Sequence, residues 1–491
     1  CDMHIKSSMP YIVYRDTVNY KNNMKNIGTV EGLNLCLEIT EPSTPDSIAS
    51  CNLGHINLKR FVKGQYVVGS DIKDSYDFRG LGEATRSLVR NLNKVIDYNR
   101  YPLDQYDNDG RIIQHGKISK PNFENRPLGI GVSGLAEVFA NLNIYYDSEE
   151  AYKINKMIFA CMYYNGLLES NIISKEQHIS SFQEGKQNDV GYKNFRYGSF
   201  RAFVDNQWKE FKGSPLSNGM FQFDMWKQEA DYLSSINKLN EKIYNREDDI
   251  PIEPNEWGQQ GSWNLLRRDI MSTGVYNSMI LAPMPTASSA QLLRNAETTE
   301  AHQTLVYSRK LAHGNYTAFS EPFIEDMRKY NLWNQKAVDF IMLENGSIKN
   351  FKKLMLEFKS DFPQEYYENE NLSPEFEFVL DHLIKKHRGM YEISQKVCLK
   401  MARQRGIYVD QSQSLNIYLA EPDMRKLKAI HDYSESLRLK TGMYYLRANP
   451  SSQTDRFTVN IDMQEFHNNM KNPNKVKKQI VCTEDVCTMC Q

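Results

Sequence analysis

The chain has 491 residues, of which 40% are hydrophobic and 25% are charged, and its 60 basic and 61 acidic residues leave a net charge of -1. These fractions are ordinary for globular proteins and exclude wholesale disorder and a collagen-like or coiled-coil chain. The balanced charge argues against broad binding to nucleic acid or anionic lipid. No apolar run approaches the ~18 residues of a membrane span, and no signal peptide is evident, so we expect a cytoplasmic protein.

The ends of the chain are unusual in their cysteines. The first residue is Cys1 rather than an initiating Met, so we expect that the chain was processed or cut from something longer. Three of the eight cysteines, Cys482, Cys487 and Cys490, lie in the last ten residues. Eight cysteines are too few for a disulfide scaffold in a chain of this length. Closely spaced cysteines in a reducing compartment are more often catalytic or metal-binding.

The first candidate site is residues 34–39, where polar and apolar residues alternate with period two. On a strand, Asn34, Cys36 and Glu38 would share one face at a spacing of about 7 Å. An amide, a thiol and a carboxylate together could supply an orienting group, a sulfur centre and a base. The alternative is an ordinary half-exposed edge strand with its polar residues toward water. Cys51 follows fifteen residues after Cys36 and, taken alone, is typical of a small core residue.

A glycine-rich segment at residues 129–134 fits the G-x-G-x-x-G pattern of dinucleotide-binding loops. Residues 125–127 before it do not indicate a strand, which weakens that interpretation. We therefore predict close backbone packing ahead of a helix over residues 135–142. A longer helix is predicted over residues 151–173, with its start in the acidic residues 147–150.

Two loops follow in the middle of the chain. Residues 245–262 contain two prolines and two glycines among charged residues and predict a surface insertion. Residues 282–291, with the sequence APMPTASSAQ, place two prolines and several hydroxyl residues before a helix. Free N–H groups and hydroxyls at a helix start suit a phosphate, although a plain capping loop has the same pattern.

The last third of the chain alternates helices and strands. A helix is predicted over residues 373–405, followed by strands over 407–409 and 414–420. A helix over residues 423–440 and a strand over 443–447 come next. A strand, a helix and a strand of these lengths form a βαβ unit, which implies a parallel sheet and the α/β fold class.

An adjacent pair of tyrosines, Tyr444 and Tyr445, ends this unit. Aromatic pairs usually serve packing. A phenol can also lose an electron and a proton together, so a redox role is the functional alternative.

The chain ends in a Cys-x-x-Cys motif formed by Cys487 and Cys490. Such a motif can cycle between dithiol and disulfide, or hold zinc, for which Cys482 would be a third ligand. Residues 468–479 are rich in Asn and Lys and predict a flexible tether that carries this motif.

Together these motifs resemble the large, catalytic subunit of class I ribonucleotide reductase in its eukaryotic and viral branch. The resemblance runs from about Met9 to the C-terminus. The motifs that carry it are residues 34–39, 51–53, 126–132, 282–288, 410–417 and 440–447 and the terminal Cys487 and Cys490.

The resemblance implies a ten-stranded β/α barrel with Cys36 on a finger loop that enters the barrel centre. Its later strands and finger loop would lie in this chain. Residues 1–467 would be the C-terminal part of the catalytic barrel, and residues 468–491 a redox-active tail.

The implied activity is the reduction of ribonucleoside 5′-diphosphates to 2′-deoxyribonucleoside 5′-diphosphates, for DNA precursor synthesis. Cys36 would be the transient thiyl radical that takes the 3′ hydrogen. Glu38 would accept the 3′-hydroxyl proton, and Asn34 would orient the ribose hydroxyls. Cys51 would be one of two thiols that reduce the 2′ position. The implied substrate-binding residues are Asn34, Leu35, Cys36, Glu38, Pro285, Thr286, Ala287, Ser288, Ser289 and Ala290, of which residues 286–290 would bind the phosphates.

The resemblance also implies partners. Tyr444 and Tyr445 would relay the radical from the tyrosyl or metal cofactor of a separate small subunit, and this chain would bind no metal itself. Cys487 and Cys490 would re-reduce the active-site disulfide and be recharged by thioredoxin or glutaredoxin. The large subunit would also form a homodimer.

The main departure from the family is its long N-terminal region, which does not precede Cys1. That region carries the sites for the nucleotide effectors ATP, dATP and dNTPs, the early barrel strands and the partner thiol of Cys51. We therefore expect the chain to be a C-terminal portion that cannot turn over without the missing fragment. A split gene, a truncated sequence and intein removal all remain open as origins.

Three rival interpretations also remain. The first is a glycyl-radical or cobalamin-dependent barrel enzyme, although neither needs a tyrosine relay. The second is a non-catalytic barrel that only assembles with reductase subunits. The third is a zinc protein built on the terminal cysteines.

Overall fold

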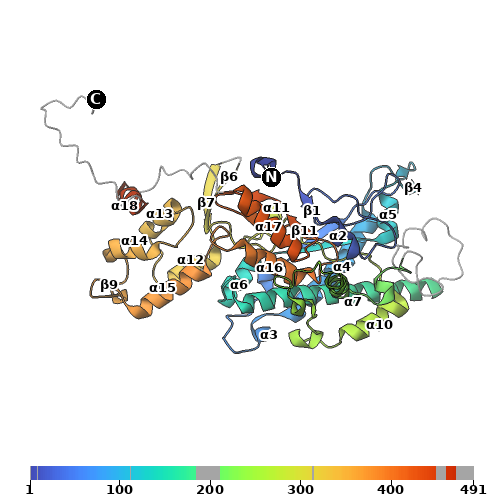
Figure 1. Cartoon of the computed structure of the whole chain (residues 1–491), viewed down its shortest axis with the longest axis horizontal. Helices are drawn as coiled ribbons and strands as arrows, with labels where there is room; N and C mark the ends of the chain where they lie inside the picture. Colours follow the sequence, from blue (N-terminus) through green and yellow to red (C-terminus); the bar gives the residue numbers. More distant parts are fainter. Residues whose placement is uncertain are drawn as a thin grey trace, which may run out of the picture. The chain divides into compact units, whose positions relative to one another are not determined.

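The computed structural model describes most of the chain and divides it into two compact units (Figure 1). Unit 1 comprises Cys1–Gln303 and Arg388–Asn449, and unit 2 comprises Thr304–His387 and Pro450–Gln491. Because the residues after 471 are not described, the division into a barrel and a tail at residue 468 stays a prediction. The described residues are 2–7, 9–110, 112–183, 211–311, 314–448 and 461–471.

Unit 1 contains parallel strand pairs, as the sequence predicted. Strand β2 (Asn52–Asn57) pairs with β5 (Leu128–Ser133) in parallel along its whole length. Every residue of β5 is buried, as is typical of a parallel strand covered on both faces. Strand β10 (Ile417–Tyr418) pairs in parallel with β12 (Leu446–Arg447), and helix α17 (Met424–Ser436) lies between them in the sequence. The predicted βαβ unit is confirmed.

The glycine-rich segment packs closely, as expected, but most of it is strand β5 itself. A Cβ at Gly131 would collide with the Met284 sulfur and come within 3.2 Å of the Met284 backbone nitrogen, so the strand and the loop at Met284 pack closely at this glycine. Gly134 has a φ of +80°, a left-handed conformation that favours glycine, and caps helix α6 (Leu135–Leu142). The segment therefore serves strand packing and helix entry.

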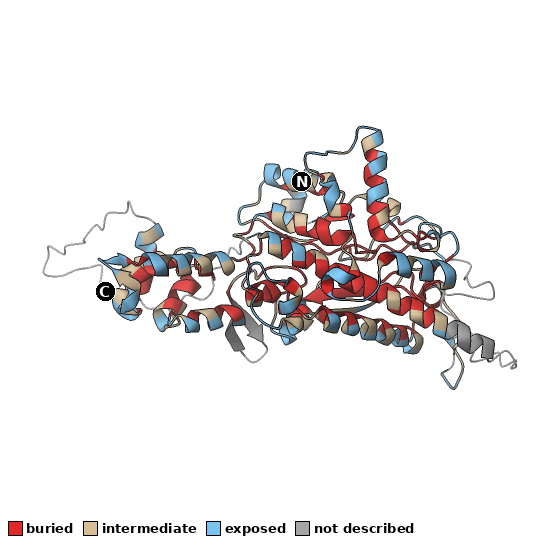
Figure 2. Ribbon diagram, turned by 90° about the horizontal axis from the view of Figure 1, so that it is seen from below, coloured by how far each residue is buried: buried red, intermediate tan, exposed pale blue. Residues whose placement is uncertain are grey.

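The core of unit 1 is organised around the long helix α7 (Glu149–Gln183), which confirms the helix predicted from residue 151. Helix α7 packs against α4 (Phe78–Tyr98), α10 (Trp263–Thr273) and α16 (Gln395–Gly406), and in Figure 1 it runs beside α4 and α10. Figure 2 shows the buried residues concentrated inside the layers of helices, with exposed residues on their outer faces.

The helix predicted over residues 373–405 is two helices, α15 (Pro374–Lys386) and α16, and the single-helix prediction is wrong. The chain passes from unit 2 to unit 1 between them. Gly389 lies in this break against the backbone of Gln303, where a Cβ would come within 2.9 Å of the carbonyl oxygen. Residues 407–409 form turns rather than the predicted strand, because their N–H groups bond to the carbonyls at the end of α16.

The segment 245–262 is more than a surface insertion, so that prediction is wrong for part of it. It contains two 3-10 helices, η3 (Arg246–Asp249) and η4 (Pro254–Trp257). Asp249 and Trp257 are buried. Asp249 forms a buried ion pair with Arg403 of α16, which fixes this segment to the core of unit 1.

The remaining described elements of unit 1 are short. They are α1 (Asp2–Ser7), β1 (Ile12–Val13), α2 (Arg15–Tyr20), η1 (Leu58–Phe61), α3 (Ile72–Ser75), β3 (Gln105–Tyr106), β4 (Ile112–Gln114), α5 (Ser119–Asn125), η2 (Leu216–Asn218), α9 (Gln222–Ser235), α11 (Ala287–Leu292) and β11 (Thr441–Met443).

Unit 2 has a separate apolar core to which Phe340, Phe351 and Leu380 belong. Its last helix, α18, spans Ile461–Lys471 and so includes the first residues of the predicted tether. His467 of α18 lies 2.7 Å from Glu344, and this contact joins the helix to unit 2. The elements are β6 (Val306–Leu311), β7 (Gly314–Phe319), α12 (Glu321–Lys329), α13 (Gln335–Leu343), α14 (Phe351–Glu357), η5 (Lys359–Asp361), η6 (Gln364–Tyr366), β8 (Tyr367–Glu368), β9 (Asn371–Leu372), α15 and α18 (Ile461–Lys471).

Within the described part of the chain, every helix is too short or too polar to cross a lipid bilayer.

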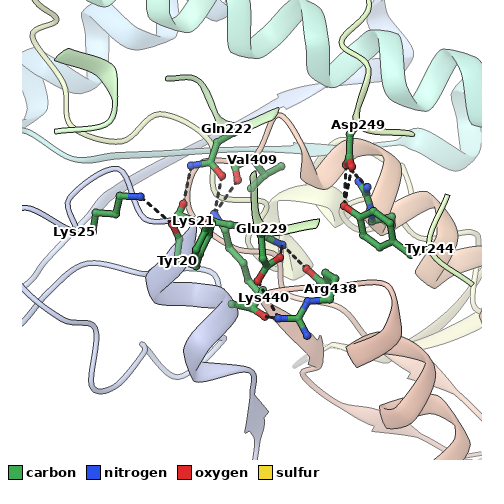
Figure 3. Close-up of polar contacts among 12 residues, drawn as sticks. Tyr20, Lys21, Lys25, Gln222, Glu229, Tyr244, Asp249, Val409, Arg438 and Lys440 are labelled. Atoms are coloured by element: carbon green, nitrogen blue, oxygen red, sulfur yellow. Dashed lines mark hydrogen bonds and ion pairs between the residues drawn. The ribbon is translucent and has the colours of Figure 1, made fainter. Parts of the chain in front are cut away.

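A buried ionic cluster connects three distant segments of unit 1 (Figure 3). Glu229 of α9 lies 2.8 Å from the Lys21 ammonium and 2.9 Å from the Arg438 guanidinium. The Lys21 and Glu229 side chains are 0% and 3% exposed. The Lys21 ammonium also lies 3.2 Å from the centre of the Trp226 ring, which adds a cation–π contact. Glu229 is thus the shared counter-ion of two cations.

A second buried cation, Lys440, lies in the same view. Its ammonium group donates to the three consecutive backbone carbonyls of residues 409–411, at 3.1, 2.7 and 2.6 Å. The Asp410 carboxylate in turn accepts from the backbone N–H groups of Ile280 and Leu281, at 2.8 and 2.7 Å. The backbone that leads into residues 410–414 is therefore held from two sides.

We predict that Glu229→Gln lowers the free energy of unfolding by ~3–5 kcal/mol, because it leaves the buried Lys21 and the half-buried Arg438 without their counter-ion. Urea denaturation followed by circular dichroism measures this change. The matched control is Glu83→Gln, which breaks the exposed pair of Glu83 with Arg79 and should cost less than ~1 kcal/mol. Equal effects of the two variants would contradict the prediction.

Candidate active site

The segment 34–39 is a tight loop, so the strand prediction made from its alternation is wrong. The Asn34 carbonyl accepts from Leu37 N–H at 3.2 Å, and the Asn34 side-chain oxygen accepts from Ile39 N–H at 3.0 Å. Leu37 has a φ of +70°, in the left-handed region. The side chain of Asn34 caps the turn. This hydrogen bond folds the segment into a loop, although its alternating pattern is typical of an extended strand. A loop is what the family resemblance implied.

Cys36 lies at this turn and contacts Tyr444. Its sulfur is 3.2 Å from the Tyr444 hydroxyl, and its carbonyl accepts from the Ser414 hydroxyl at 2.5 Å. Burial raises the pKa of the Cys36 thiol, more than the hydrogen bond to Tyr444 lowers it. The group is therefore held as a thiol at neutral pH. A protonated thiol beside a phenol is suited to hydrogen-atom exchange rather than to nucleophilic attack.

Glu38 is buried, with 2% of its surface exposed. Its carboxylate accepts from the Ser414 hydroxyl at 3.1 Å, and its carbonyl accepts from Ser412 N–H at 2.8 Å. Ser414 therefore contacts both Cys36 and Glu38, and it fixes the thiol and the carboxylate relative to each other.

Three tyrosines form a cluster next to the thiol. The ring centres of Tyr444 and Tyr445 are 4.2 Å apart. Tyr11, which precedes β1, lies 5.4 Å from Tyr444 and 6.2 Å from Tyr445. The antiparallel pairing of β1 with β11, with Ile12 opposite Met443, brings this distant tyrosine to the pair. The sequence pattern pointed only to the adjacent two.

The hydroxyl groups of the cluster differ in acidity. Burial, with hydrogen bonding to Tyr445, raises the pKa of Tyr11 to about 12. Burial, followed by the hydrogen bond with Cys36, raises the pKa of Tyr444. The pKa of Tyr445 is lowered, because Tyr444 and Tyr11 act on it through hydrogen bonds. Of the three hydroxyl groups, that of Tyr445 therefore loses its proton most readily.

Cys51 lies just before β2 and is tied to the same polar segment. The Gln411 side chain donates to the Cys51 sulfur at 3.4 Å and to the Leu128 carbonyl at 3.0 Å. The side-chain oxygen of Gln411 accepts a hydrogen bond from Thr40 N–H at 2.9 Å. Burial, and then the charge of Glu41, raises the pKa of Cys51 well above its ordinary value. Gln411 therefore links Cys51 to the loop that carries Cys36.

The loop before α11 begins a helix where the sequence predicted one. Thr286 is its N-cap residue and is buried, and its hydroxyl accepts from Thr298 N–H at 3.0 Å. Ala287 and Ser288 are exposed in the first turn. Ala290 is buried, and its N–H donates to the Thr286 carbonyl at 2.7 Å. The groups of this turn that can reach a ligand are therefore those of residues 287–289.

The proline-rich part of this loop joins the site through one contact. The Pro283 carbonyl accepts from Ser414 N–H at 3.0 Å. The same serine thus connects the start of the candidate phosphate loop to the Cys36 and Glu38 loop. Pro285 and Ser289 are half-buried, and Leu35 is 70% exposed at the tip of the turn.

Several expected residues cannot be placed. Cys1, Cys482, Cys487 and Cys490 lie outside the described residues. Cys161 and Cys398 are free thiols in the described part of unit 1, as are Cys36 and Cys51. Among the described residues there is no group of three or more His, Cys, Asp or Glu that could hold a metal ion.

The site also includes residues to which sequence reasoning gave no role, namely Tyr11, Glu41, Gln411 and Ser414. The signal for the last two was present, since residues 410–414 read Asp-Gln-Ser-Gln-Ser and all five are buried. A run of polar residues between apolar ones marks a hydrogen-bonding segment. Nothing local marks Tyr11, which is brought in by strand pairing.

Residues 1–445 match the family model described as ribonucleotide reductase, barrel domain. The chain belongs to this family. The resemblance read from the motifs is therefore confirmed, and so is the α/β fold class with a barrel of the ribonucleotide reductase type.

Curated relatives in the ribonucleotide reductase family cover nearly the whole chain. The ribonucleoside-diphosphate reductase large subunit of Monkeypox virus is 32% identical over 489 residues, which are 100% of this chain and 49% of that protein. The large subunit of Caenorhabditis elegans is 32% identical over 486 residues, or 99% of this chain and 49% of that protein. The chain thus spans about half the length of the curated relatives it matches.

A solved structure supports the family fold at greater distance. It is the alpha subunit of the Actinobacillus ureae class Id ribonucleotide reductase, with a TM-score of 0.55 and 18% sequence identity. The likeness covers 92% of this chain and 60% of that chain. It shows a shared fold.

We predict that Tyr11→Phe raises the pKa of Tyr445, because a hydrogen bond that favours the phenolate is lost. A charge-assisted hydrogen bond of ordinary strength corresponds to roughly one pH unit. A fluorotyrosine placed at position 445 reports its own titration by fluorine NMR. Tyr98→Phe, at a tyrosine that is 85% exposed, is the control and should leave the titration unchanged, and no change in Tyr11→Phe would disprove the contact.

Proposed function

We propose that the chain forms the catalytic part of a ribonucleoside-diphosphate reductase large subunit, which converts ribonucleoside 5′-diphosphates to 2′-deoxyribonucleoside 5′-diphosphates. The observation that carries the proposal is the 3.2 Å contact between the Cys36 sulfur and the Tyr444 hydroxyl, at the end of a tyrosine cluster. A half-buried thiol that stays protonated and touches a phenol is the arrangement that radical initiation at sulfur needs.

Radical initiation follows from that contact. A hydrogen atom passes from the Cys36 thiol to the Tyr444 oxygen radical across one hydrogen bond, which leaves a thiyl radical and a phenol. Tyr445 lies next in the path, with its ring 4.2 Å from Tyr444. The oxidising equivalent comes from the metal or tyrosyl cofactor of a small-subunit partner.

At the substrate, the Cys36 thiyl radical takes the 3′ hydrogen atom of the ribose. Glu38 accepts the proton of the 3′ hydroxyl, and Asn34 orients the ribose hydroxyls. Because the Asn34 oxygen is already used by Ile39 N–H, its amide hydrogens are the groups turned to the sugar. Cys51 and a partner thiol outside this chain supply two electrons, so that substrate and two thiols give deoxynucleotide, water and a disulfide.

The diphosphate is bound at the start of α11 within residues 286–290, by groups of residues 287–289, while Thr286, Ala290 and Pro285 shape the loop. The first N–H groups of a helix have no acceptor within the helix and can donate to phosphate oxygens. The Ser288 hydroxyl is exposed in this turn. Ser289 donates to the Thr286 carbonyl at 3.1 Å, which steadies the turn.

Cys487 and Cys490 then re-reduce the active-site disulfide and are recharged by thioredoxin or glutaredoxin. Turnover also needs the part of the large subunit that this chain does not cover, which supplies the second thiol and binds the nucleotide effectors. A homodimer of the complete large subunit with the small subunit is the assembly we propose.

We predict that Cys36→Ser abolishes deoxynucleotide formation, because an alcohol O–H is too strong to be the hydrogen-atom donor. The measurement is conversion of a labelled ribonucleoside diphosphate by the chain, combined with the upstream region, the small subunit and a dithiol. Cys398→Ser, at a thiol outside the site, is the matched control and should retain turnover. A non-catalytic scaffold would give equal turnover with and without Cys36, which would overturn the proposal.

A further inference from the structure

Glu41 is a second buried carboxyl in the site, and the mechanism above does not use it. It follows Glu38 by three residues and is 5% exposed. Its Oε1 atom is fully buried and has no hydrogen-bond partner among the described residues. A buried carboxyl oxygen without a partner is costly for a charged group, so its placement needs an explanation.

The two carboxyls have different neighbours. Glu38 accepts from the Ser414 hydroxyl and faces the Cys36 side of the site. The groups that act on Glu41 by hydrogen bonding are the Cys51 thiol and the Gln411 amide. Gln411 also donates to the Cys51 sulfur at 3.4 Å. Cys51, Gln411 and Glu41 thus form a small cluster of thiol, amide and carboxyl.

The protonation of this cluster suits proton transfer at neutral pH. Burial raises the pKa of Glu41 to about 7, and hydrogen bonding by Cys51 and Gln411 opposes this rise. Glu41 is therefore present in both protonation states near neutrality. An acid whose pKa lies near the working pH is the most effective proton donor. The pKa of Cys51 is much higher, so a Cys51 thiolate formed here would take up a proton.

We propose that Glu41 is the proton donor to Cys51 when the active-site disulfide is reduced. The proposal rests on the role of Cys51 proposed above. In the step, the thiolate of an incoming dithiol attacks the partner sulfur, the S–S bond breaks, and Cys51 leaves with the electron pair as a thiolate. The Glu41 carboxylic acid transfers its proton to that sulfur and becomes a carboxylate. Gln411 donates to the sulfur throughout, and water then reprotonates Glu41.

This role also fits a carboxyl whose Oε1 atom has no hydrogen-bond partner among the described residues. A carboxyl held by strong donors, as in an ion pair, would have a low pKa and carry no proton at neutral pH. Glu41 has no cation beside it among the groups that shift its pKa, which are Cys51 and Gln411. Its environment keeps the proton available for the sulfur.

The test uses the 491-residue chain alone. Cys51 is converted to a mixed disulfide with 2-mercaptoethanol, and its release by dithiothreitol is followed by mass spectrometry of the peptide that contains it. In Glu41→Gln, which keeps the size and removes the acid, release should slow at least ~10-fold at a pH below the pKa of Glu41. Glu41→Asp should recover part of the rate. Glu31→Gln, at an exposed carboxylate on the same segment, is the matched control and should have no effect.

A second readout guards against a variant that merely disturbs the fold. Loss of the Glu41 charge should shift the pH profile of Cys51 alkylation by iodoacetamide to lower pH, whereas unfolding would expose Cys161 to the reagent as well. Unchanged release and unchanged alkylation in Glu41→Gln would overturn the proposal. A separate outcome concerns the proposed function. If Cys51→Ser leaves turnover intact in the reconstituted enzyme, the role of Cys51 in catalysis is wrong, but a measured effect of Glu41 on the chemistry of Cys51 would still hold.

Discussion

The site depends on one buried polar segment, residues 410–414, which forms hydrogen bonds to several elements that are distant in sequence. Lys440 donates to the carbonyls of residues 409–411 on one side. On the other side, Ser414 contacts the Cys36 carbonyl and the Glu38 carboxylate. Buried polar groups are costly when unpaired, so this segment has one arrangement that satisfies it. That arrangement sets the positions of the reactive groups.

The two sulfurs of the site have different neighbours, and these suit them to different chemistry. Cys36 is paired with the tyrosine cluster through Tyr444 and is kept as a thiol, which suits one-electron chemistry. Cys51 is paired with Gln411 and Glu41, an amide and a titrating carboxyl, which suits two-electron thiol–disulfide exchange. The same segment, residues 410–414, holds both sulfurs. In the mechanism that we propose, radical transfer and disulfide reduction occur in one site and use different proton carriers.

Much of this could be predicted from sequence, and the failures share a cause. The sequence predicted α6, α7, α11 and the βαβ unit of β10 and β12, because helix caps and hydrophobic periodicity depend only on residues that are close in sequence. The alternation at residues 34–39 predicted a strand and was wrong, since a side-chain cap from Asn34 closes the turn. The helix over residues 373–405 failed because the boundary between units falls inside it. Tyr11 could not be found from a motif, since only the pairing of β1 with β11 brings it to Tyr444 and Tyr445.

In the proposed mechanism, Tyr444 passes the oxidising equivalent to Cys36. The most direct measurement is turnover of Tyr444→Phe in the complex with the upstream region and the small subunit, together with ribonucleoside diphosphate binding by equilibrium dialysis. Phenylalanine keeps the ring and removes the hydroxyl that lies 3.2 Å from the Cys36 sulfur. We expect unchanged substrate binding and no deoxynucleotide. Deoxynucleotide formation at the rate of the unmodified chain would contradict this mechanism.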